Sequence, residues 1–173
     1  MSQKKAKGKK AEIQAKDLLV QLDRLYSDYL EKYQQQEKSK SKVAKLFGKW
    51  FASFEPTLSD SMHQEFLAGI ERVIKELAMT LNSLKQENLQ LCHSIAGKAV
   101  SRLMMPKPAN EKTTAEWYMT VAEYQCFPLL PYLSREDLKH FHDLMLKRVP
   151  KRMMYPRQRQ LVAQMEELLN VKE

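Results

Sequence analysis

Apolar residues in this chain recur at intervals of three and four, the spacing at which side chains line one face of an α-helix. The alternation of β-branched and polar residues that is typical of strands is absent, and glycine occurs only 4 times in 173 residues. The sequence therefore predicts an all-α protein. Helices are expected over about 12–36, 43–54 and 61–96, and in three further segments that begin near Thr113, Ser134 and Pro156.

The most regular apolar pattern lies between residues 61 and 96. Read as heptads, this segment places Leu67, Ile74, Leu81, Asn88 and Ile95 at a positions, and Ile70, Leu77, Leu84 and Leu91 at d positions. No proline interrupts it, and the register continues without an insertion. The pattern predicts one long coiled-coil-like helix over about 61–96.

Asn88 is the single polar residue in this seam. An amide at an a position lowers stability but pairs with its counterpart on a neighbouring helix, which fixes register and oligomer number. On this interpretation the protein is a homo-oligomer. Its self-association seam comprises Leu81, Leu84, Asn88, Leu91 and Ile95. Apolar residues also flank the first half of the segment, as in a helix packed inside its own subunit, so both alternatives stay open.

Composition suggests four consecutive regions. Residues 1–11 hold five lysines within the first ten positions and are expected to be a disordered basic tail. Residues 12–105 form the predicted helical bundle with its long heptad helix, interrupted by a polar break at 37–42. The segment 106–112 contains two prolines and is expected to be a linker. Residues 113–173 then form a smaller, basic C-terminal helical unit.

Capping signals mark the helices of this C-terminal unit. Thr113 with Glu116 fits a capping box, and Ser134 with Asp137 has the same spacing. Pro150 should end one helix, and Pro156 suits the first position of the next. The apolar run "FPLLPYL", with its two prolines, is expected to be a connector pressed onto the core.

A basic connector between the last two helices is the predicted binding surface. Six cations lie on it, and no acidic residue occurs between Asp143 and Glu166. The predicted nucleic-acid-binding residues are Lys147, Arg148, Lys151, Arg152, Arg157 and Arg159. Prolines restrict this connector, and a helix N-terminus favours anions. Tyr155, Met153 and Met154 lie among the cations and are suited either to stacking on a base or to filling the core.

Two alternatives limit this interpretation. A run of charges is often only a solvated face. A helix-turn-helix would place Arg157 to Gln160 in a major groove, but the connection is longer than that motif uses, and Glu166 and Glu167 would repel phosphates. Phosphate contact without base reading is the better supported expectation.

Charge and cysteine content bear on partners and compartment. The formal net charge is +8, which favours polyanionic partners such as nucleic acid (DNA or RNA), anionic lipid or an acidic protein. Cys92 and Cys126 form no paired framework, so a reducing compartment is expected, the cytoplasm or, in a eukaryote, the nucleus. The start of the chain does not resemble a secretory signal, and no stretch is long and apolar enough to span a membrane.

Catalytic motifs are absent from the sequence. No phosphate-binding glycine loop, nucleophile elbow or metal-ligand spacing occurs, so we expect no enzyme, no metal and no cofactor. The sequence therefore predicts a non-catalytic, self-associating protein that contacts nucleic acid largely independently of base sequence. The alternative is an adaptor or chaperone that binds an acidic or helical protein partner.

Overall fold

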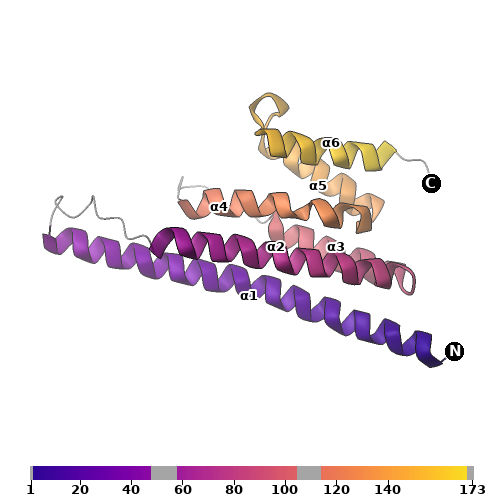
Figure 1. The fold of residues 1–173 in the computed structure, drawn as a ribbon. Helices are drawn as coiled ribbons and strands as arrows, with labels where there is room; N and C mark the ends of the chain where they lie inside the picture. Colours follow the sequence, from indigo (N-terminus) through magenta and orange to yellow (C-terminus); the bar gives the residue numbers. More distant parts are fainter. Residues whose placement is uncertain (1, 48–57, 105–113, 171–173) are drawn as a thin grey trace.

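The computed structural model describes residues 2–47, 58–104 and 114–170, and within these ranges it contains six α-helices, two 3-10 helices and no strand. The all-α prediction is therefore confirmed. Helix α1 lies along one side of the molecule and α5 and α6 lie on the opposite side, with α2, α3 and α4 between them (Figure 1).

Helix α1 is a single helix from Ser2 to Phe47. It buries a stripe at helical spacing that consists of Ala15, Leu18, Leu22, Tyr26 and Tyr29. The helix begins at Ser2, in contrast to the disordered tail expected for residues 1–11. It also continues through 37–42, where a polar break was expected. Lysine, glutamate and serine do not terminate a helix unless the backbone finds a better partner, which explains both differences. The predicted helix over 43–54 is thus the end of α1 as far as Phe47, and residues 48–54 lie outside the described ranges.

The single helix predicted over 61–96 is wrong, because the chain turns at residues 86–88. Helix α2 runs from Leu58 to Lys85 and α3 from Leu89 to Leu103. The backbone N–H groups of Glu87 and Asn88 both donate to the carbonyl of Leu84, at 3.0 and 2.7 Å. Asn88 leaves the helical region with φ −151° and ψ 87°. The apolar residues keep their helical spacing on both sides of the turn because α2 and α3 direct these residues into the same core.

The C-terminal half contains α4 (Thr114–Glu123), the 3-10 segment η2 (Tyr124–Tyr132), α5 (Arg135–Arg148), the 3-10 turn η3 (Lys151–Met153) and α6 (Pro156–Asn170). The predicted cap at Ser134 is confirmed, since its hydroxyl accepts from the N–H of Asp137 at 3.0 Å. Helix α6 begins at Pro156 as predicted. Thr113, the first residue of the other predicted capping box, lies outside the described residues.

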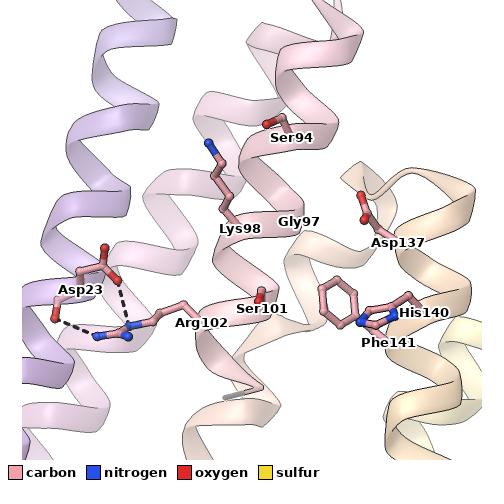
Figure 2. A pocket seen from close by; sticks show the side chains of 9 residues that line it. All are labelled: Asp23, Ser94, Gly97, Lys98, Ser101, Arg102, Asp137, His140 and Phe141. Carbon is pink, nitrogen blue, oxygen red and sulfur yellow. Dashed lines mark hydrogen bonds and ion pairs between the residues drawn. The ribbon is translucent and has the colours of Figure 1, made fainter. Parts of the chain in front are cut away.

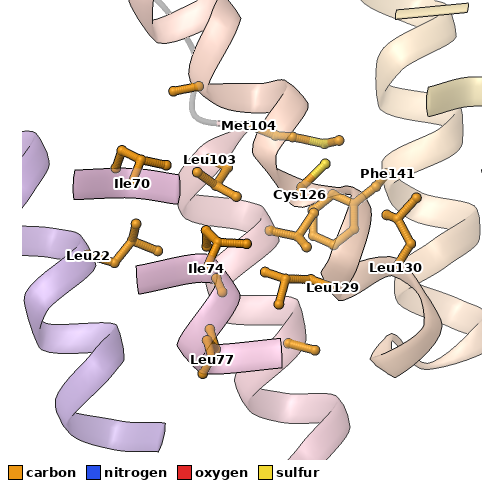
Figure 3. Close-up of a cluster of buried hydrophobic side chains, with 14 of the residues drawn as sticks. Leu22, Ile70, Ile74, Leu77, Leu103, Met104, Cys126, Leu129, Leu130 and Phe141 are labelled. Atoms are coloured by element: carbon orange, nitrogen blue, oxygen red, sulfur yellow. The ribbon is translucent and has the colours of Figure 1, made fainter. Parts of the chain in front are cut away.

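One hydrophobic core joins both halves of the chain. Side chains from α1, α2, α3, η2 and α5 meet in it, among them Leu22, Ile74, Leu103, Leu129 and Phe141 (Figure 3). The apolar segment η2 is pressed onto this core as predicted, with Leu129 fully buried. The predicted bundle (12–105) and C-terminal unit (113–173) therefore share their core. The predicted linker at 106–112 falls outside the described residues.

A cluster of stacked rings packs between α1, α2 and α4. The hydroxyl of Tyr29 lies 2.8 Å from Nδ1 of His63, and both residues are buried. Tyr29 stacks on Phe66 at a centroid distance of 4.1 Å, and His63 stacks on Tyr118 at 4.0 Å. Burial raises the pKa of the Tyr29 hydroxyl, so it stays protonated.

Candidate polyanion-binding connector

The basic connector comprises residues 147–160, from the end of α5 through η3 to the first turn of α6. It lies at one end of the α5–α6 pair, on the side of the molecule away from α1 (Figure 1). The N-terminus of α1, which carries Lys9 and Lys10, lies at the far end of the molecule (Figure 1). The two basic segments of the sequence are therefore separate surfaces.

Local hydrogen bonds fix the backbone of the connector. Val149 ends α5 in an extended conformation, as a residue before proline must, and the N–H of Met153 donates to the carbonyl of Pro150 at 2.8 Å. At the start of α6 the side chain of Gln158 accepts from the N–H of Tyr155 at 3.0 Å. This is the returning half of a capping box, and it leaves Gln158 buried.

Arg148 is partly exposed, but its guanidinium is bonded to groups of its own chain. Its Nη1 donates to Oε1 of Glu123 at 3.3 Å, and its Nη2 donates to the carbonyl oxygen of Met104 at 2.5 Å. Glu123 is buried, so the guanidinium compensates a carboxylate that has left water. Arg148 therefore joins the end of α5 to the ends of α3 and α4, and the sequence alone could not distinguish it from the other cations of the connector.

Lys151 is also held by a carboxylate of its own chain. Its Nζ donates to Oε1 of Glu166 at 2.6 Å, and the same oxygen lies 3.3 Å from Nε2 of His142. The hydrogen bond from Lys151, followed by that from His142, lowers the pKa of the Glu166 carboxyl. This contact ties η3 to α6 and partly neutralises Lys151.

The other four predicted cations are differently placed. Lys147, Arg152, Arg157 and Arg159 are exposed, and in the described part of the chain none of them forms an ion pair with a carboxylate. Two apolar side chains are exposed beside them, Met153 at 68% and Tyr155 at 53%, whereas Met154 between them is buried at 4%. The connector thus carries four exposed cations, one at the end of α5, one on η3 and two in the first turn of α6, with two exposed apolar side chains between them in the sequence.

The residues predicted as a self-association seam lie mostly inside one chain. Leu81, Leu84 and Ile95 are at most 2% exposed, and Leu91 is half-buried. Asn88 is exposed, and its side chain accepts from the N–H of Leu91 at 3.0 Å. The intramolecular alternative therefore describes these positions, and Asn88 acts as the N-cap of α3.

A second polar feature escaped the sequence analysis. An open groove of about 610 Å³ lies between α1, α3 and α5, where Gly97 faces Asp137 (Figure 2). Arg102 in this groove forms an ion pair with Asp23, at 2.9 Å from Nε to Oδ1. Because its residues come from three helices, no sequence pattern marks it. Its charges are mixed in sign, so it carries less weight than the connector as a binding surface.

Histidine, cysteine and acidic side chains are spread over the described ranges. No three histidine, cysteine or acidic side chains there come together as metal ligands. Cys92 and Cys126 are buried free thiols, and burial raises the pKa of each, which leaves them poor nucleophiles. No helix in these ranges combines the length and apolar character needed to cross a membrane.

Comparison of the chain with protein families, with curated proteins and with solved structures finds no significant match.

Proposed function

We propose that the protein is a non-catalytic nucleic-acid-binding protein whose basic connector contacts backbone phosphates. The observation that carries this proposal is the exposure of Lys147, Arg152, Arg157 and Arg159 along the connector from the end of α5 to the first turn of α6, without neutralising carboxylates among the described residues. Arg148 and Lys151 have a different role, because their internal bonds hold the loop in place. Phosphate contacts of this kind supply affinity that is independent of base sequence.

The start of α6 also supports binding without base reading. A recognition helix reads bases with the side chains of its first turns, and the amide of Gln158 would suit adenine. Gln158 is instead buried, and its side-chain oxygen is used by the N–H of Tyr155. Three polar side chains of this first turn remain exposed: Arg157 and Arg159, which suit phosphates, and Gln160, the one amide there that is still free to reach a base edge.

Salt dependence tests the proposal. If all four exposed cations contact phosphates, a plot of the logarithm of the duplex binding constant against the logarithm of salt concentration should have a slope of about −3.6. The double substitution Arg157→Gln and Arg159→Gln should lower affinity on unrelated sequences alike and reduce the slope by about 1.8. The measurement is fluorescence anisotropy with labelled random-sequence duplexes at several salt concentrations.

The matched control removes the same charge elsewhere. Arg24 on α1 and Arg72 on α2 are exposed arginines on helices outside the connector, so Arg24→Gln with Arg72→Gln gives an equal change in net charge. This control should retain most of the affinity. Equal losses in both double variants would mean that net charge alone drives binding. An unchanged affinity and slope in the connector variant would contradict the proposal and favour an acidic protein as partner.

A further inference from the structure

Side chains at the tip of the connector alternate between solvent and core. Met153 is 68% exposed, Met154 is 4% exposed and Tyr155 is 53% exposed. Met154 and Tyr155 form the non-helical step between η3 and α6, and Met154 is extended with φ −71° and ψ 139°. In extended backbone, residues two apart point to the same side. The buried Met154 therefore anchors the step, and Met153 and Tyr155 lie on its outer side.

The exposed ring is carried on a fixed backbone. The N–H of Tyr155 donates to Gln158 at 3.0 Å, its carbonyl accepts from the N–H of Arg159 at 3.1 Å, and Pro156 restricts its conformation. A loop held in this way loses little entropy when a ligand binds. The exposed apolar side chains at this tip are therefore preorganised for a partner.

Cations precede and follow this apolar tip in the sequence. Arg152 immediately precedes Met153, and Arg157 follows Tyr155 by two residues, with both arginines exposed. An exposed aromatic ring with arginines two and three residues away in the chain suits a flat, apolar ring that is attached to phosphates. Unpaired bases present such a ring, whereas the bases of a duplex are stacked on each other and offer only their edges.

We infer that the connector binds single-stranded nucleic acid in preference to duplex, with one base stacked on Tyr155 and packed against Met153. This inference rests on the proposed phosphate-binding function and specifies its ligand. The cations follow the sugar-phosphate backbone on either side of the stacked base. Because every base has an aromatic face, stacking of this kind is compatible with little sequence preference.

A membrane surface is a less suitable partner for the same residues. Peripheral membrane binding uses a helix whose whole apolar face enters the lipid. On the connector the exposed large apolar side chains are Met153 and Tyr155, while the apolar residues of α6 that face the protein, Leu161, Val162 and Met165, are buried.

Anisotropy with labelled oligo-dT and with its duplex with oligo-dA tests the inference. The wild-type protein should bind the single strand more tightly. Tyr155→Leu should weaken single-strand binding by about fivefold or more and leave duplex binding unchanged, since stacking on an aromatic ring contributes at least that factor per base. Tyr155→Phe retains a ring and should bind as the wild type does. Circular dichroism of all variants checks that helicity is retained.

Three results separate the inference from the function on which it rests. If Arg157→Gln with Arg159→Gln weakens binding but Tyr155→Leu does not, phosphate binding stands and stacking is overturned. If neither nucleic acid binds at low salt, both proposals fail. If phosphatidylserine vesicles bind, Tyr155→Leu abolishes that binding and oligo-dT does not bind, the tip is a membrane contact and the inference is overturned.

Discussion

The side-chain oxygen of Asn88 lies 3.0 Å from the backbone nitrogen of Leu91 and accepts its hydrogen bond, which caps α3 at its first turn. Asparagine is among the best N-cap residues because its side chain satisfies an N–H that the helix itself leaves unpaired. The polar residue in the leucine seam therefore ends one helical segment and starts another.

Substitution of Asn88 tests this role. Asn88→Leu should lower the free energy of unfolding by about 1 kcal/mol, because an aliphatic side chain leaves the N–H of Leu91 without a partner. Asn88→Asp retains an acceptor at the same place and should be close to the wild type. Urea unfolding measures both changes. A more stable Asn88→Leu protein that also changes its mass by light scattering would instead support a continuous helix with an intermolecular seam.

Two buried tyrosines on α1 provide a matched pair. Tyr29 bonds to His63 through its hydroxyl, whereas the hydroxyl of Tyr26 is buried and has no hydrogen-bond partner among the described residues. Tyr29→Phe should cost about 1 kcal/mol of stability, and Tyr26→Phe should be neutral or stabilising, because it removes a buried hydroxyl that pays a desolvation cost.

Both substitutions delete one oxygen from the same helix, so chemical denaturation of the two variants compares like with like. Equal losses of stability would mean that the Tyr26 hydroxyl has a partner or that the Tyr29 bond contributes nothing.

Arg148 should behave differently from the exposed arginines of its own connector. Arg148→Gln removes the guanidinium from the buried Glu123 carboxylate and from the carbonyl of Met104, and it should cost about 1.5 to 3 kcal/mol. Arg157→Gln should change stability by less than about 0.5 kcal/mol, since its side chain is on the surface.

A double-mutant cycle with Glu123→Gln isolates the interaction between Arg148 and Glu123. Arg148→Gln should lower the free energy of unfolding by less in the Glu123→Gln protein than in the wild type. If Arg148→Gln and Arg157→Gln have equal and small effects on the urea midpoint, Arg148 faces solvent and is available to phosphates like its neighbours.

Local chemistry explains what could be predicted from the sequence. The helical period predicts an all-α fold because it records which face of each segment is buried. The cap at Ser134 and the start of α6 at Pro156 were also predictable, since hydroxyl caps and proline act within a few residues of themselves. The concentration of cations on the connector follows from the sequence in the same direct way.

Tertiary structure decided which part of the protein packs against each apolar face and which group each cation contacts. The heptad pattern of residues 61–96 is compatible with one long helix or with two that share a core, because a periodic stripe does not specify what covers it. The six cations of the connector look equivalent in sequence, yet Arg148 meets a buried carboxylate from α4 and Lys151 meets Glu166 from α6. Met153 and Met154 are adjacent and chemically identical, and only packing against the core separates the exposed one from the buried one. Contacts between residues distant in the chain decide all three, and local periodicity carries no information about them.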